Sequence, residues 1–172
     1  SLPVSAFVAH ADGTFEQGAS AYEKRGVAVM VPEWDETKCI QCNRCSYVCP
    51  HATIRPFALT EEEVAAAPEG LQVAKMTGKG LEALKFTMAV SPMDCMGCGV
   101  CVGECPAKEK AIKMVPRESQ EYKQPVFDYL VANVGKKEGM PAKETVKGSQ
   151  FEKPLLEFSG SCAGCAETAY AR

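Results

Sequence analysis

The chain has 172 residues, of which 46% are hydrophobic and 24% are charged, and its formal net charge at pH 7 is −3. This length corresponds to about one domain with room for a buried core. The composition excludes a disordered chain and lacks the basic excess of a nucleic-acid-binding protein. Because no apolar run is long enough to span a membrane and no signal peptide is present, we expect a cytoplasmic protein without membrane or nucleic-acid partners.

Both ends of the sequence indicate a piece of a longer protein. The chain starts with Ser1 rather than methionine, and it stops at Arg172, inside a helix that residues 165–170 predict. We therefore expect further polypeptide on both sides.

Residues 1–37 form a first segment without a catalytic motif. The apolar run at residues 27–31 predicts a strand, which Pro32 is expected to end. The preceding run Glu23-Lys24-Arg25 is interpreted as charged surface in contact with solvent. We expect this segment to connect the next module to another part of the protein.

Residues 38–116 contain eight of the ten cysteines, in two copies of one pattern. Each copy has three cysteines separated by two residues and, after three further residues, a fourth cysteine followed by proline. Thiolates so close on a tight loop can converge on a metal centre, whereas disulfides are improbable in a reducing compartment. The copies are Cys39-x2-Cys42-x2-Cys45-x3-Cys49-Pro50 and Cys95-x2-Cys98-x2-Cys101-x3-Cys105-Pro106.

The spacing favours iron–sulfur clusters. A single Cys-x2-Cys pair fits zinc, a dithiol or a cluster, but the full pattern is typical of bacterial two-cluster ferredoxins, whose fourth cysteine ligates the other cluster. Zinc, the alternative, would leave four of the eight cysteines without a role. The sequence therefore predicts two [4Fe–4S] clusters, the first bound by Cys39, Cys42, Cys45 and Cys105 and the second by Cys49, Cys95, Cys98 and Cys101.

Residues between the cysteines are expected to shape the surroundings of the clusters. Gly97, Gly99 and Gly103 have no side chain and let backbone N–H groups approach sulfur. His51 is interpreted as a packed or capping residue, because thiolates already bind every iron. Six aliphatic side chains are predicted to form an apolar shell: Ile40, Val48, Ile54, Val100, Val102 and Ile112.

The sequence around the motifs predicts an α+β, ferredoxin-like fold with an insertion. A short strand is expected after each motif, at residues 53–55 and 111–115, which gives a twofold repeat. Between the motifs, Thr60-Glu61-Glu62-Glu63 is a capping box that starts a short helix, and residues 85–90 predict a strand. We expect the insertion to cover the module.

The part that follows, residues 117–153, is predicted to be a helix and a linker. Phe127, Leu130, Val131 and Val134 have helical spacing within residues 119–134, and Gly135 is suitable just beyond a helix end. This apolar stripe is interpreted as core or interdomain packing. Residues 135–153 are rich in lysine, glycine and proline and predict a linker that crosses the surface.

The last two cysteines, Cys162 and Cys165, stand outside the repeated pattern. Alone, such a pair fits a metal site or a thioredoxin-like dithiol, although the strand pattern that flanks a thioredoxin motif is missing.

Four runs carry a resemblance to a known family: Leu2-Pro3-Val4-Ser5-Ala6-Phe7, Tyr22-Glu23-Lys24-Arg25-Gly26, Cys39-Ile40-Gln41-Cys42-Asn43 and Leu156-Glu157-Phe158-Ser159-Gly160-Ser161-Cys162-Ala163-Gly164-Cys165. Together with the two-cluster module, they resemble the single-chain pyruvate:ferredoxin oxidoreductases, or pyruvate synthases. The resemblance covers the whole chain and implies a Glu-Lys-Arg region at 1–37, a ferredoxin-like domain at 38–116, and the start of a thiamine-diphosphate-binding domain at 154–172.

The resemblance implies the electron-transfer segment of an enzyme. Members of this family oxidatively decarboxylate pyruvate with thiamine diphosphate and Mg²⁺, transfer the acetyl group to coenzyme A, and pass electrons singly to ferredoxin or flavodoxin. It implies that Cys162 and Cys165 supply two of the four ligands of a third, proximal [4Fe–4S] cluster. The first cluster is then medial and the second distal, no residue of this chain is catalytic, and the complete enzyme is a homodimer.

Three lysines after the second motif, Lys108, Lys110 and Lys113, have two interpretations. They form either a docking patch for an acidic ferredoxin or ordinary solvated surface.

Two rival functions remain from the sequence alone. A freestanding two-cluster ferredoxin would explain eight cysteines but not Cys162, Cys165 or the segments that flank the module. The equivalent segment of another 2-oxoacid oxidoreductase would share all these features.

Overall fold

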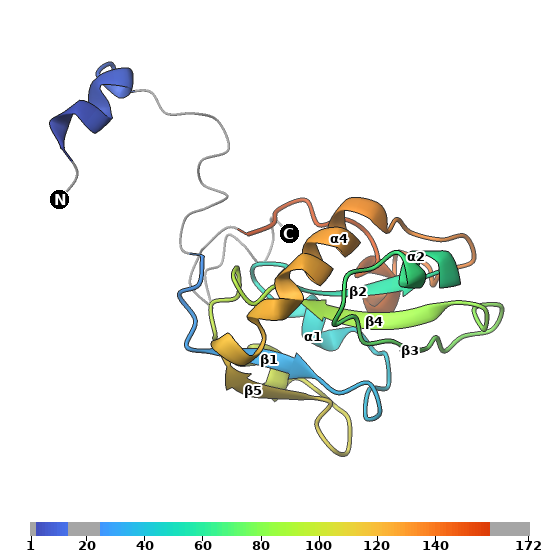
Figure 1. The fold of residues 1–172 in the computed structure, drawn as a ribbon. Helices are drawn as coiled ribbons and strands as arrows, with labels where there is room; N and C mark the ends of the chain where they lie inside the picture. The colour runs from blue at the N-terminus through green and yellow to red at the C-terminus, as the bar shows by residue number, and fades with distance from the viewer. Residues whose placement is uncertain (1–2, 14–24, 159–172) are drawn as a thin grey trace.

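The computed structural model describes residues 3–13 and 25–158 and has an α+β fold, as the sequence predicts (Figure 1). Two small antiparallel sheets form its framework, and short helices connect and cover them. The elements are η1 (Val4–His10), β1 (Met30–Trp34), α1 (Arg44–Tyr47), β2 (Ile54–Leu59), α2 (Glu61–Ala65), β3 (Ala74–Lys75), β4 (Lys85–Val90), α3 (Val100–Gly103), β5 (Ile112–Pro116), η3 (Arg117–Ser119), η4 (Glu121–Lys123), α4 (Gln124–Asn133) and α5 (Val146–Ser149).

The sheets have the nested pairing of a twofold repeat. β1 pairs with β5 at the ends of the module, while β2 pairs with β4 inside it, and β3 adds a third strand beside β4. Each cysteine loop is followed by one short helix and one strand, α1 and β2 in the first half and α3 and β5 in the second. The two halves therefore repeat a loop, helix and strand.

The strands differ from the predicted ones at two prolines. β4 covers residues 85–90 as predicted, but β1 begins at Met30 and continues through Pro32, so the strand predicted at residues 27–31 is displaced. β2 is longer than predicted and continues through Pro56. Both strands have a neighbour on one side only. A proline can lie in such an edge strand because its missing N–H group can face away from the partner.

The insertion is part of the module rather than a separate unit. Its helix α2 begins with the predicted capping box, in which the backbone N–H of Glu63 donates to the Thr60 hydroxyl and the Glu63 carboxylate accepts from the backbone N–H of Thr60. The insertion then contributes β3, and Met76 and Leu81 are buried in the same apolar cluster as Phe86.

Helix α4 packs across β4 through Val126, Phe127 and Leu130, which are buried (Figure 1). The helix begins at Gln124, later than predicted, because 3₁₀ turns η3 and η4 occupy residues 117–123. The apolar stripe packs on the core, as the helical spacing indicates.

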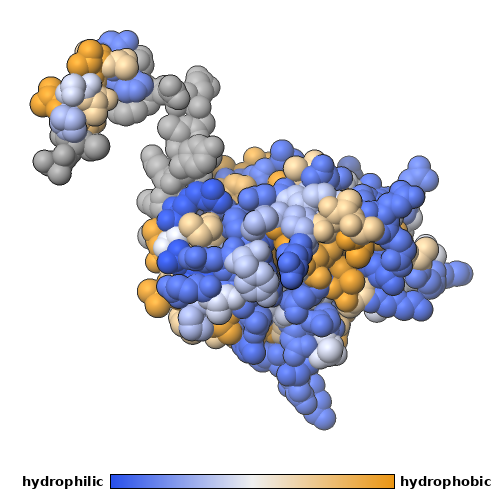
Figure 2. Space-filling model, in the orientation of Figure 1, coloured by the Kyte–Doolittle hydropathy of each residue, from blue (hydrophilic) through white to orange (hydrophobic). Residues whose placement is uncertain are grey.

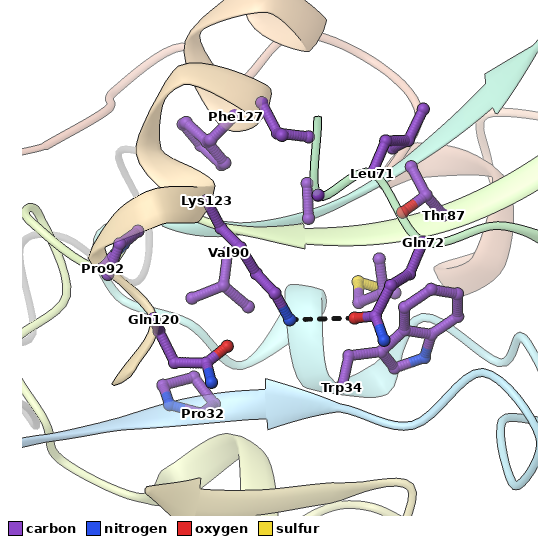
Figure 3. Close-up of a pocket in the computed structure, with 14 residues that line it drawn as sticks. Pro32, Trp34, Leu71, Gln72, Thr87, Val90, Pro92, Gln120, Lys123 and Phe127 are labelled. Atoms are coloured by element: carbon purple, nitrogen blue, oxygen red, sulfur yellow. Dashed lines mark hydrogen bonds between the residues drawn. The ribbon is translucent and has the colours of Figure 1, made fainter. Parts of the chain in front are cut away.

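A small cavity remains between α4, β1 and β4 (Figure 3). The Lys123 amino group donates to the Gln72 side-chain oxygen across it, at 2.9 Å. Burial lowers the pKa of Lys123. None of the cysteines in the described part of the chain lines this cavity, so it is separate from the candidate metal centres.

The segment predicted as a surface linker is also a cover for the first cysteine loop. The Asn43 side chain donates to the Lys147 carbonyl oxygen at 2.9 Å, and the Ser46 hydroxyl donates to the Gln150 side chain at 2.9 Å. The ring of Phe151 meets that of Phe86 edge-on. Within residues 3–13 and 25–158, no helix is long and apolar enough to cross a membrane.

We predict that Gly148→Ala loosens this cover. A Cβ atom at Gly148 would lie 2.0 Å from the Ala142 carbonyl oxygen, so the backbone must shift, at a cost of about 2 kcal/mol in the free energy of unfolding. Gly135→Ala is the matched control, because a Cβ atom there meets nothing within 4 Å. Chemical denaturation of the loaded protein measures both, and equal stability of the two variants would contradict the prediction.

Candidate metal centres

The structure brings the eight cysteines of the two motifs together in the two predicted sets. Cys39, Cys42, Cys45 and Cys105 line one small cavity, which we call the first centre. The second centre is a small cavity lined by Cys49, Cys95, Cys98 and Cys101. Each cavity thus takes three cysteines from one repeat and the fourth from the other, which is the crossed arrangement that the motif predicts.

The cysteine loops turn through left-handed backbone conformations at matching positions. Gln41 and Asn43 have φ of 55° and 61° in the first loop, and Gly97 and Gly99 have φ of 70° and 74° in the second. At the first of these positions the backbone N–H reaches sulfur: Gln41 N donates to Cys39 Sγ at 3.4 Å and Gly97 N to Cys95 Sγ at 3.3 Å. Both loops therefore present thiols and backbone donors in the same way.

The first loop adopts this conformation without glycine because its amide side chains are anchored. Gln41 donates to the Lys75 carbonyl oxygen at 2.8 Å and accepts from the backbone N–H of Thr77 at 2.9 Å. Asn43 is held by α5, as described above. Such bonds offset the strain of a left-handed non-glycine residue. Neither residue is predicted from the cysteine spacing, although aligning the two repeats places them opposite Gly97 and Gly99.

At one position of the second loop, only glycine fits, because φ is positive and there is no room for a side chain. A Cβ atom on Gly97 would lie 2.9 Å from the Met30 carbonyl oxygen, whereas one on Gly99 would meet nothing within 4 Å. Gly103 has neither constraint. The three glycines that the sequence singles out are therefore not equivalent.

Burial disfavours the ionised form of four of these thiols. Burial raises the pKa of Cys39 and Cys45, that of Cys95 to about 11 and that of Cys101 to about 12. Neighbouring thiols contribute across the repeats, since Cys105 acts on Cys39, and Cys49 acts on Cys95 and Cys101. Thiolates that are so disfavoured need positive charge, and iron supplies it while displacing the protons.

Further groups fit an iron–sulfur cluster. The Trp34 side chain lines the first centre, and its buried indole N–H interacts with Cys39, where it lowers the pKa of that thiol against the larger opposing effect of burial. The Thr53 hydroxyl lies 3.4 Å from Cys49 Sγ beside the second centre. Within residues 3–13 and 25–158, no three His, Cys, Asp or Glu side chains are close enough to share one metal ion. A [4Fe–4S] cluster does not need that, because each thiolate binds a different iron.

The predicted apolar shell is only partly closed. Ile54 and Ile112 are buried and line the centres. Ile40 and Val100 also line them, but they are 58% and 39% exposed, so the shell is open to solvent there. Both lie within cysteine loops at the surface. Trp34 and Met88 complete the wall of the first centre and were not predicted. His51 is buried against the second centre, in agreement with its interpretation as a packed residue.

Arg25 is not the solvated residue that the sequence predicts. Its guanidinium pairs with Asp94 at 3.1 Å, and Asp94 also accepts from the Ser91 hydroxyl at 2.7 Å. Because Asp94 directly precedes Cys95, the pair fixes the start of the second loop. Glu23 and Lys24 lie outside the described residues, as do Cys162 and Cys165.

Comparison with known proteins assigns this geometry to a class. Residues 38–109 match the model of a 4Fe-4S dicluster domain, and residues 1–28 match a domain of unknown function named EKR. The chain therefore contains a 4Fe-4S dicluster domain of the ferredoxin type.

Several longer proteins are similar to nearly the whole chain. The chain is 54% identical over 171 residues to pyruvate-flavodoxin oxidoreductase of Klebsiella pneumoniae, and 49% identical over 177 residues to pyruvate:ferredoxin oxidoreductase of Moorella thermoacetica. Each match covers 99% of this chain but 14% of the relative. It is also 44% identical to the mitochondrial pyruvate dehydrogenase [NADP(+)] of Euglena gracilis, over 99% of this chain and 9% of that protein. The chain is thus similar, over nearly its whole length, to one segment of these pyruvate oxidoreductases, and it spans only a small part of them.

We predict that Cys49→Ala damages the second centre more than the first, although Cys49 lies in the first motif. The reason is that Cys49 lines the cavity of the second motif's cysteines. Cys45→Ala, the control from the same motif, removes a thiol of the first centre. Electron paramagnetic resonance of the reduced protein distinguishes the two signals, and loss confined to the first centre in Cys49→Ala would refute the crossed assignment.

Proposed function

We propose that this chain is the electron-transfer segment of an enzyme that oxidatively decarboxylates pyruvate with coenzyme A to acetyl-CoA and CO₂. Electrons pass singly through [4Fe–4S] clusters to ferredoxin or flavodoxin. The observation that carries the proposal is the pair of cavities, each lined by four cysteines drawn from both repeats, in a chain homologous to pyruvate oxidoreductases.

When bound, each cluster stores and releases one electron at a time. The residues of this chain supply the surroundings. The four cysteines of each set hold the irons, and backbone N–H groups such as those of Gln41 and Gly97 donate to ligand sulfur, which favours the reduced state. Buried Ile54 and Ile112 exclude water from the centres.

The parts of the reaction outside this chain complete the proposal. Cys162 and Cys165 supply two ligands of a third cluster, next to thiamine diphosphate and Mg²⁺ in a domain that begins at 154–172. Pyruvate and coenzyme A bind elsewhere in a homodimeric, cytoplasmic enzyme. Residues 1–37, 38–116 and 117–153 are its connecting region, ferredoxin-like domain, and helix with linker.

The relatives favour this function over a freestanding ferredoxin. Their similarity continues through residues on both sides of the dicluster match, which a small carrier would not need. They also leave a second electron acceptor as a candidate, since relatives in Euglena gracilis and Cryptosporidium parvum carry the name pyruvate dehydrogenase [NADP(+)].

The experiment is anaerobic metal analysis followed by substrate addition. We predict about eight iron and eight sulfide for the two centres of the 172-residue chain, because each set of four thiolates binds one cluster. This chain alone exchanges electrons with dithionite but does not decarboxylate pyruvate, whereas the complete enzyme reduces both centres on addition of pyruvate and coenzyme A. Zinc in place of iron, or a complete enzyme whose centres pyruvate does not reduce, would contradict the proposal.

A further inference from the structure

The two centres share one loop conformation, but each has a side-chain donor that the other lacks. The first centre is lined by Trp34, which lies five residues before Cys39 at the end of β1. The matching position of the second repeat, five residues before Cys95 at the end of β4, is occupied by Val90. At this position of the repeat, an indole N–H group is therefore available to the first centre and not to the second.

The second centre has the reverse asymmetry. Thr53 lines it and directly precedes β2, and its hydroxyl lies 3.4 Å from Cys49 Sγ. Burial raises the pKa of Cys95 to about 11, and the Thr53 hydroxyl acts against that rise. Because a thiolate has no proton, the hydroxyl must be the donor once iron is bound. The residue that directly precedes β5 in the other repeat is Ala111, whose side chain cannot donate.

Packing holds the Trp34 indole against the first centre. Its ring meets that of Phe86 edge-on at 5.9 Å, and its backbone lies opposite Ile112 of β5. The same side chain also borders the cavity between α4, β1 and β4 (Figure 3). The indole Nε1 is buried, has no oxygen acceptor within hydrogen-bond range among the described residues, and interacts with Cys39. Since an indole N–H only donates, it can stabilise negative charge on this sulfur.

Both donors lie away from solvent. Figure 2 shows hydrophilic residues over most of the face in view, whereas Trp34 is only 4% exposed and Thr53 only 2%. Water therefore does not compete for either donor, and the low dielectric of a buried site strengthens each hydrogen bond. A donor in such a place acts on cysteine sulfur more strongly than a solvated donor would.

A hydrogen bond to ligand sulfur changes the energy of one redox state more than that of the other. A reduced [4Fe–4S] centre carries one more negative charge than an oxidised one, so a donor to sulfur stabilises the reduced state and raises the reduction potential. The backbone donors are matched, because Gln41 N and Gly97 N lie 3.4 and 3.3 Å from the first cysteine sulfur of their loops. The side-chain donors are therefore the hydrogen bonds in which the two centres differ.

We propose that Trp34 raises the reduction potential of the first centre and Thr53 that of the second, each by donating a hydrogen bond to cysteine sulfur. The two potentials can then be set independently, because each donor serves one centre. This role of the two side chains rests on the proposed function, in that the two cavities hold [4Fe–4S] clusters. When a centre is reduced, one electron passes to it from the reductant and no covalent bond changes.

The test is an anaerobic redox titration of the iron-loaded 172-residue chain, followed by electron paramagnetic resonance. Trp34→Phe keeps an aromatic ring and removes the N–H group. We expect the equilibrium constant for reduction of the first centre to fall roughly tenfold, which is about 59 mV for one electron. The second centre, whose signal is the one that Cys49→Ala damages, should keep its potential.

Thr53→Val is the matched variant, because it keeps the shape of the side chain and removes the hydroxyl. We expect it to lower the potential of the second centre and to leave that of the first unchanged, whereas Thr53→Ser should retain both potentials. Each variant is therefore the control for the other. A loaded Trp34→Phe chain whose first centre keeps its potential, or a shift confined to the opposite centre in either variant, would overturn these roles.

A second measurement needs no substitution. The chain contains one tryptophan, so tryptophan with an isotopic label on its indole nitrogen marks Trp34 alone. We expect electron–nuclear double resonance to detect coupling of this nitrogen to the reduced first centre. Its absence would overturn the role of Trp34, even if Trp34→Phe failed to bind iron. A chain without iron would contradict the proposed function itself, whereas a loaded chain with unmoved potentials contradicts only these two roles.

Discussion

The constraint on which the structure depends is the burial of cysteine thiols whose ionised form needs a cation. Burial raises the pKa of Cys39, Cys45, Cys95 and Cys101, so the protein alone keeps these groups neutral. Each cavity also draws its fourth cysteine from the opposite repeat, Cys105 in one case and Cys49 in the other. A cluster in either cavity therefore ties the two halves together, and metal binding and folding are coupled. Helices as short as α1 and α3 are marginal alone, so they depend on their contacts with the rest of the module.

The two loops have the same backbone conformation, but different residues stabilise it in each. Gly97 and Gly99 adopt left-handed φ values at little energetic cost. Gln41 needs its side-chain hydrogen bonds with β3 and Thr77, and Asn43 needs the one with α5. The insertion and residues 135–153 are consequently structural partners of the first loop. The second loop is fixed at its start through Asp94, which pairs with Arg25 and accepts a hydrogen bond from Ser91. The first centre thus has its own covering segments within this chain, while the exposed apolar edge at Val27 and Val29 beside the second loop has none among the described residues.

Spacing predicted the cysteine sets and the ferredoxin-like repeat because both are local in sequence and chemically specific. It also predicted β4 and the capping box of α2, where period and capping residues agree. The predicted strand ends at Pro32 and Pro56 are wrong. A proline ends a strand only where a neighbouring strand needs the N–H group that proline lacks, and the sequence does not show this. It missed Gln41, Asn43 and Arg25, whose partners Lys75, Lys147 and Asp94 are distant in sequence. Composition predicted that residues 135–153 form a linker. In the structure, the buried Gly148 lets the backbone of this segment pack closely against Ala142.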